Sequence, residues 1–203
     1  MSQYPKWFDD VESITLYDGL SEVLGTFKEG IIKIKYLPIV KMAGHSCPTV
    51  AGAYLMTLRA LKTLYPDTLP VRGEIKVSFK EDSSEGVAGV IAQVISNITG
   101  ATDTTGFKGL GGKHSRIDLM NFKSEIGASA RFERVDTGKM VDVYYNHSSI
   151  PGDPRMQELM PKVIGEIASD EEKQLFGELW QERVRKILIE NCDNDQVCKV
   201  VEL

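Results

Sequence analysis

The sequence predicts an α+β protein with one mixed sheet, long central helices and a C-terminal helical extension. Three observations favour this class: two long segments with apolar residues at helical spacing, several shorter segments in which apolar and polar residues alternate, and a change to helical spacing after Asn146. The 203 residues are enough for one sizeable domain. We therefore expect a core over residues 1–150 and an extension over residues 151–203 that packs on it.

The first two segments are expected to be a helix and then a strand. Apolar residues such as Leu16, Leu20 and Val23 recur at helical spacing over residues 8–27, which predicts a helix there. Over residues 30–40, isoleucines alternate with lysines, and this alternation predicts a strand.

Two apolar helices with a strand between them are expected to form the centre of the protein. Pro48 suits the first position of a helix over residues 49–65. This helix has so little polar face that we expect it to be central or to lie at an interface. Residues 72–80 alternate cleanly and predict a half-buried strand. The glycines and alanines of residues 85–98 indicate a second helix that packs closely on its neighbours.

A glycine-rich loop and further strands complete the predicted core, and helices form the extension. Residues 99–113 form the glycine-rich loop. The sequence Asp136-Thr137-Gly138 predicts a hairpin turn between the last two strands. Ser169 followed by Glu172 fits a capping box at a helix start. The remaining predicted elements are strands over residues 116–122, 128–135 and 139–145 and helices over residues 156–166 and 169–191.

Charge and composition exclude several classes of partner. A formal net charge of −5 gives the chain no electrostatic attraction to nucleic acid or to an anionic membrane. No segment has the apolar length of a signal peptide or of a membrane-spanning helix. Three cysteines are too few for a disulfide framework, so we expect a cytoplasmic protein with reduced thiols.

The strongest chemical signal is the stretch AGHSCPTVAGAY, residues 43–54. Cys47 lies at the predicted start of a helix, where unsatisfied N–H groups and the helix dipole favour a thiolate over a thiol. His45 lies two residues earlier, and imidazole with thiolate suits zinc, iron, nickel or copper. Either residue alone is more often structural, but the pair at a helix start favours a function. A zinc site needs three or four ligands, so this motif supplies half of one.

The glycine-rich loop that leads to His114 is a second candidate site. It does not match a phosphate-binding P-loop, because Phe107 and His114 stand where that motif requires glycine and Ser or Thr. A loop this long is often functional, although a flexible connection is the alternative. Its glycines would let backbone N–H groups approach an anion. Its polar side chains are Thr99, Thr102, Asp103, Lys108, Lys113 and His114.

Three other reactive side chains fit less specific interpretations. His147 stands between Asn146 and Ser148, which indicates a solvated loop histidine. Cys192 and Cys198 are separated by five residues, a spacing that does not match a zinc knuckle. They are interpreted as tail thiols or as a redox-labile pair.

The stretch GHSCPTVAGAY resembles the opening motif of the FmdE family, which takes its name from the formylmethanofuran dehydrogenase operon. That family shows G-H-x-C-P before a long helix and, later, a T-G-x-T loop. The resemblance extends from about Leu16 to Leu188. It implies a core of the glyceraldehyde-3-phosphate-dehydrogenase-like type, a homodimer, and a transition metal at the His and Cys of the motif. The matching residues are Gly44, His45, Cys47 and Pro48, then Thr99, Gly100 and Thr102.

The chain departs from the family at Ala101, where the loop usually has a cysteine. Its tail also has too few cysteines for the zinc finger that some members carry. The resemblance therefore implies a divalent transition metal (zinc, nickel or iron) on His45 and Cys47, with Asp103 or His114 as replacement ligand. The protein would be a metal-dependent enzyme or a redox-linked accessory protein. An anionic small-molecule substrate would be attracted by Lys108, Lys113 and Arg116, with Thr99 and Thr102 beside it.

Two alternatives stay open from the sequence. The chain would be a non-catalytic protein that binds haem or a pterin, or an assembly factor for another metalloenzyme, with His45 or Cys47 as the ligand. Alternatively, Cys47 would act as a nucleophile with His45 as its base, although residues i and i+2 rarely align for proton transfer.

Overall fold

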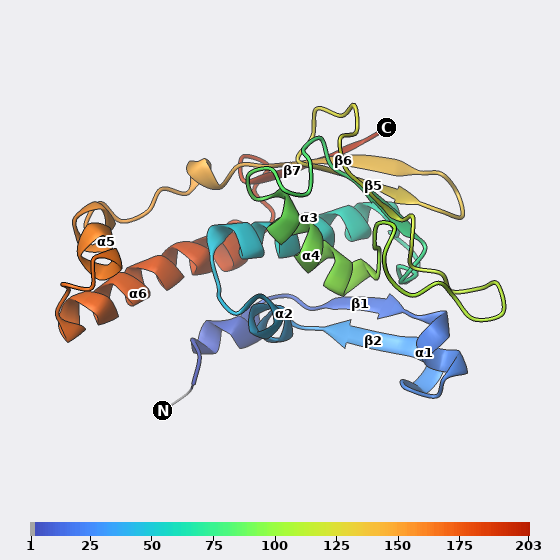
Figure 1. Ribbon diagram of the computed structural model, residues 1–203, viewed down its shortest axis with the longest axis horizontal. Coiled ribbons are helices and arrows are strands. Elements are labelled where there is room, and N and C mark those ends of the chain that lie inside the picture. The colour runs from blue at the N-terminus through green and yellow to red at the C-terminus, as the bar shows by residue number, and fades with distance from the viewer. Residues whose placement is uncertain (1–2) are drawn as a thin grey trace.

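The computed structural model describes residues 3–203 and arranges them in three layers (Figure 1). The middle layer holds α3 (Pro48–Leu64) and α4 (Ala88–Thr99). On one side of these helices lies a five-stranded sheet. On the other side lies an antiparallel ribbon of β1 (Ile14–Tyr17) and β2 (Ile31–Ile34). The apolar centre predicted for the helix over residues 49–65 is confirmed, because thirteen of the seventeen residues of α3 are buried.

The five-stranded sheet is mixed, which confirms the α+β class. Its strand order is β4-β3-β5-β6-β7, with β3 and β4 parallel and the other pairs antiparallel. The glyceraldehyde-3-phosphate-dehydrogenase-like character of this core stays a prediction. The strands are β3 (Ile75–Ser78), β4 (Met120–Asn121), β5 (Ala130–Arg134), β6 (Met140–Tyr145) and β7 (Cys198–Glu202).

The helix predicted over residues 8–27 is wrong. Residues Lys6–Asp10 form a 3-10 turn, β1 follows, and only α1 (Gly19–Val23) is helical. Ile14 and Leu16 are buried at alternate positions of β1, while the apolar residues after α1 are exposed. β1 forms its strand hydrogen bonds with β2. Because β2 lies outside residues 8–27, the apolar spacing within that segment could not indicate this pairing.

The strand predicted over residues 30–40 is confirmed in its first half only. After β2 the chain turns into α2 (Tyr36–Ala43), with Pro38 in its first turn. Proline is tolerated there because the first N–H groups of a helix have no partner within it. The alternation of isoleucine and lysine therefore ends where the burial of Tyr36 and Ile39 begins.

The later strands and the loop agree with prediction in order but differ in length. The strand predicted over residues 116–122 shortens to the two residues of β4. A turn with Gly138 at φ +71° joins β5 to β6, as predicted. The strand β7 was not predicted, and it pairs with β6 at the edge of the sheet. The predicted boundary between core and extension is not tested, although β7 brings the end of the chain into the main sheet.

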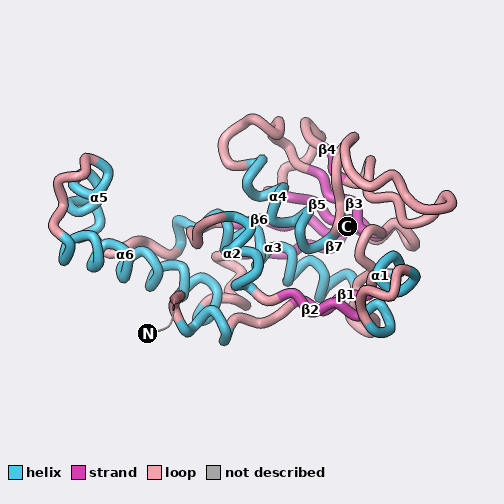
Figure 2. The backbone as a smooth tube through the Cα atoms, turned by 60° about the horizontal axis from the view of Figure 1, so that its bottom comes forward, coloured by secondary structure: helices cyan, strands magenta, loops and turns pink. Residues whose placement is uncertain are grey.

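Residues 156–185 form a helical arm that extends away from the layers (Figures 1 and 2). It consists of α5 (Met156–Ile164) and α6 (Asp170–Arg185), followed by a π-helical turn, Lys186–Glu190. The capping box is confirmed: Ser169 Oγ accepts from the Glu172 N–H, and the Glu172 carboxylate accepts from the Ser169 N–H. Within residues 3–203, the helices are all too short or too polar to span a membrane.

Candidate functional site

The start of α3 holds the motif that the sequence singled out. Cys47 is the N-cap residue, and its Sγ accepts a hydrogen bond from the Val50 N–H at 3.4 Å. Cys47 is buried, whereas His45 is exposed. His45 Nδ1 lies 3.0 Å from the carbonyl oxygen of Ala43. Because a carbonyl only accepts, Nδ1 must donate, and a neutral ring then keeps its lone pair on the free Nε2.

Four other side chains hold this turn in place. Tyr36 and Ser46 share a buried hydrogen bond of 2.9 Å between their hydroxyls. From α6, Trp180 Nε1 and Gln181 Nε2 donate to the Ser46 carbonyl at 3.1 and 3.0 Å. Tyr145 Oη donates to the Pro48 carbonyl at 2.7 Å. The segment between His45 and Pro48 is therefore fixed from α2, α6 and β6, which gives any ligand there a rigid support.

The structure does not bring the four predicted metal ligands into one group. Among residues 3–203, no three His, Cys, Asp or Glu side chains are placed to hold a metal together. His114 lies beside Gly19 in α1, where a Cβ would be 3.0 Å from His114 Cε1. α1 is at the opposite end of the β1–β2 ribbon from α2, which leads to His45 (Figure 1). Asp103 Oδ1 instead accepts from the N–H and hydroxyl of Thr105, both at 2.9 Å.

The residues predicted to bind substrate divide into two groups. Lys108 and Lys113 are exposed and free to meet an anion. Thr99 and Thr102 donate from their hydroxyls to the carbonyls of Ile95 and Arg116, at 2.8 and 2.7 Å, so they hold the loop in place. Arg116 is buried, and a role for it toward substrate stays a prediction.

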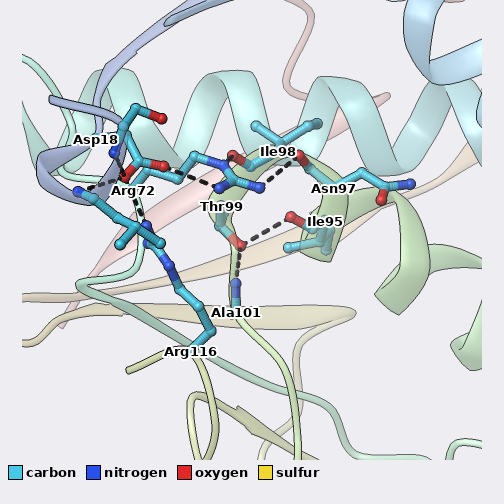
Figure 3. Close-up of polar contacts among 10 residues, drawn as sticks. Asp18, Arg72, Ile95, Asn97, Ile98, Thr99, Ala101 and Arg116 are labelled. Carbon is cyan, nitrogen blue, oxygen red and sulfur yellow. Dashed lines mark hydrogen bonds and ion pairs between the residues drawn. The ribbon is translucent and has the colours of Figure 1, made fainter. Parts of the chain in front are cut away.

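A buried ionic cluster at the base of the glycine-rich loop was missed by sequence reasoning (Figure 3). Asp18 accepts from Arg116 Nη2 at 2.7 Å and from Arg72 Nη1 at 3.0 Å. The side chains of Asp18 and Arg116 are 2% and 7% exposed. Arg72 also donates to the carbonyls of Ile98 and Asn97, at the end of α4. The cluster therefore joins α1, the segment before β3, α4 and the loop.

Burial and the two arginines have opposite effects on the pKa of Asp18. Burial acts to raise the pKa of its carboxyl, but the hydrogen bond from Arg72 and the charge of Arg116 outweigh burial and lower it below the ordinary value of 3.8. Asp18 also accepts from the N–H groups of Leu20 and Ser21 as the N-cap of α1. An Asp before a short helical segment is the one sequence signal that would have indicated this residue.

An apolar cavity lies beside His45 on the arm. It has a volume of about 470 Å³ and lies between α5, α6 and the turn before α3. Its lining is mostly hydrophobic, with few polar groups, as is common in small-molecule sites. Its lining includes His45, Met160, Ile164, Phe176 and Trp180.

The fold and the site define a small α+β protein with a His-x-Cys motif at the start of a buried helix. The family model described as "FmdE, Molybdenum formylmethanofuran dehydrogenase operon" matches residues 42–198, which is most of the chain. The chain therefore belongs to the FmdE family, as its motif predicted. The match begins just before His45, so β1, α1 and β2 precede it. No curated protein matches the chain.

Proposed function

We propose that this protein binds a divalent transition metal, zinc, nickel or iron, through His45 Nε2 and Cys47 Sγ. The observation that carries the proposal is the hydrogen bond between His45 Nδ1 and the Ala43 carbonyl. A ligating histidine commonly donates its other ring nitrogen to a carbonyl or carboxylate, and this bond orients the ring. At Cys47, Sγ accepts a hydrogen bond from the Val50 N–H at the start of α3, and sulfur is a ligand that suits these metals.

The two residues supply an incomplete set of donors. A structural zinc site has four protein ligands, and a catalytic site keeps three with one open position. Among residues 3–203 of one chain, no third His, Cys, Asp or Glu side chain joins His45 and Cys47 in a group that could hold a metal. The other coordination positions of the metal would therefore be filled by water, by a bound ligand or by a second copy of the chain. When bound, the metal would act as a Lewis acid or as a redox centre.

The test is metal analysis of protein that was purified without chelator. We expect His45→Ala and Cys47→Ala to lose bound metal. The matched controls are His147→Ala and Cys192→Ala, which remove the same chemical groups elsewhere in the chain. Equal metal content in all four variants, or no metal in the unsubstituted protein after incubation with zinc, nickel and iron, would overturn the proposal.

The cavity beside His45 favours a second candidate, a non-catalytic protein that binds a planar cofactor such as haem or a pterin. The rings of Phe176 and Trp180 lie 5.7 Å apart and face this cavity together with His45. Added haem would then give a visible absorption band that His45→Ala abolishes and His147→Ala keeps. A colourless mixture with unchanged tryptophan fluorescence would exclude this candidate.

A further inference from the structure

A second cavity, of about 230 Å³, lies between β1 and the C-terminal half of α3, which run alongside each other (Figure 1). It lies toward the end of α3 that is opposite Cys47, and it shares no lining residue with the cavity beside His45. Its apolar wall consists of Ile14, Leu58 and Leu61, which are all buried. At about 30 Å³ for each water molecule, the cavity has room for a ligand of about seven non-hydrogen atoms.

Tyr65 lines this cavity, and its buried hydroxyl has no hydrogen-bond partner among residues 3–203. Tyr65 as a whole is only 5% exposed. Burial raises the pKa of Tyr65 to about 12, while the charge of Arg134 and the nearby Val71 N–H act to lower it. Because Val71 follows Pro70, the hydroxyl lies toward the end of the cavity that Pro70 lines. Arg134 and the Val71 N–H can only donate, so what this hydroxyl lacks is an acceptor.

The backbone groups of Thr15 point away from β2, toward the open side of β1. The Asp18 N–H donates to the Gly30 carbonyl at 2.8 Å, at the end of the β1–β2 ladder. In an antiparallel ladder, successive residues direct their N–H and carbonyl groups to opposite sides of the strand. Asp18 faces β2, so Tyr17 and Thr15 present both of their backbone groups on the other side.

A proline ends the pairing on this open side of the strand. The Tyr17 N–H donates to the Pro70 carbonyl at 2.9 Å, and the Tyr17 carbonyl accepts from the Arg72 N–H at 2.8 Å. Continued by two residues, the same parallel pattern would need the Pro70 nitrogen to donate to the Thr15 carbonyl. Proline has no N–H, and no other segment of residues 3–203 continues the pairing. Thr15 therefore keeps one N–H and one carbonyl, side by side, at the cavity that it lines.

The charged groups that line the cavity neutralise each other. Lys62 Nζ lies 2.6 Å from Glu12 Oε2, and the two side chains are 52% and 55% exposed. This pair leaves neither a free ammonium nor a free carboxylate to select an ion. The groups that a ligand would meet are therefore a neutral hydroxyl, a backbone N–H with its carbonyl, and an apolar wall.

We propose that this cavity binds a small neutral molecule with an amide group in a ring, so that its carbonyl and N–H lie on one edge. The ligand N–H donates to the Thr15 carbonyl. The ligand carbonyl has two lone pairs and accepts from both the Thr15 N–H and Tyr65 Oη. Its carbon atoms pack on Leu58 and Leu61. This inference goes beyond the proposed function, because it requires neither a metal nor His45.

The first experiment titrates isotope-labelled protein with 2-piperidone, a neutral cyclic amide of fitting size, and follows the backbone amide signals by NMR. We expect saturable shifts at Thr15 and Val71, and none at Ser46 or Gly177 beside the other cavity. Cyclohexanone has the same ring size without the N–H and should bind about tenfold more weakly. Pentanoate and pentylamine test charged ligands. Tighter binding of either ion, equal binding of cyclohexanone, or shifts that do not saturate would overturn the proposal.

The second experiment removes only the Tyr65 hydroxyl. Tyr65→Phe should weaken the binding of 2-piperidone about tenfold. Its urea midpoint should be equal or higher, because the hydroxyl has no partner to lose in the free protein. The control Tyr144→Phe removes an exposed hydroxyl from β6 and should leave binding unchanged. A less stable Tyr65→Phe with unchanged binding would overturn the proposal, since the hydroxyl would then be paired within the fold. Metal content, measured on the same samples, reports on His45 and Cys47 alone.

Discussion

Arg116 donates a hydrogen bond of 2.7 Å to the buried carboxylate of Asp18, across 98 positions of the sequence. Arg72 donates to the other oxygen of the same carboxylate at 3.0 Å. One carboxylate thus holds two guanidinium groups, and Arg116 Nη1 has no further partner among residues 3–203. The base of the glycine-rich loop is fastened to α1 by this charge pairing.

Loss of the Asp18 charge should destabilise the whole fold. Asp18→Asn keeps the shape of the side chain but leaves two buried or half-buried guanidinium groups without a counter-charge. Breaking a buried pair in this way typically costs about 3–5 kcal/mol of unfolding free energy, to be measured by urea denaturation. The control Asp153→Asn removes an exposed carboxylate that pairs with Arg155 and should have a much smaller effect. Similar losses in both variants would contradict the central role of the cluster.

The same cluster should make stability depend on pH. Because the pKa of Asp18 is lowered in the folded state, its contribution is fully present above the ordinary value of 3.8 and is lost as pH falls through the folded value. The difference in unfolding free energy between the unsubstituted chain and Asp18→Asn should therefore shrink as pH falls below that value. A series of urea melts from neutral pH downward measures it. A difference that stays constant over this range would show that Asp18 is not held as a charged group.

The packing of Tyr145 on α3 should not tolerate a side chain at Gly52. A Cβ there would lie 2.1 Å from Tyr145 Cε1, and Tyr145 is held by its bond to the Pro48 carbonyl. Gly52→Ala should therefore cost about 1–3 kcal/mol, as overpacking does, and lower the melting temperature. Gly127→Ala meets nothing within 4 Å and should change stability by about 0.5 kcal/mol or less. A harmless Gly52→Ala would mean that Tyr145 moves freely.

The three cysteines should differ in their reaction with an alkylating reagent. Burial raises the pKa of Cys198 to about 12, so this thiol should stay unlabelled until the protein unfolds. Burial, followed by the charge of Asp193, also raises the pKa of Cys192. If Cys47 binds metal, added zinc should slow the labelling of Cys47 and leave Cys192 unchanged. Peptide mass spectrometry measures both rates, and equal slowing at both thiols would contradict specific binding.

Local signals in the sequence predicted where α3 begins, but not which segments pack around that helix start. The start of α3 was predictable because a proline at the first helical position and an N-cap residue act within one turn. His114 or Asp103 was expected to join that site as a replacement for the cysteine that the family loop usually has where this chain has Ala101. In the structure the base of this loop instead lies against α1, because Arg116 donates a hydrogen bond to the carboxylate of Asp18. The Thr102 hydroxyl also donates to the Arg116 carbonyl, which holds the two ends of the loop together.

Residue spacing and contacts within a single turn were enough to predict the α+β class, the buried helix α3, the family motif at its start and the capped helix α6. The folded chain was needed to show that residues 14–17 form a strand, that β7 closes the sheet and that Arg116 is buried. Strand pairing and the neutralisation of a buried charge depend on partners far away in the chain. The spacing of apolar residues within a short segment therefore cannot indicate which strands pair or which buried charges are neutralised.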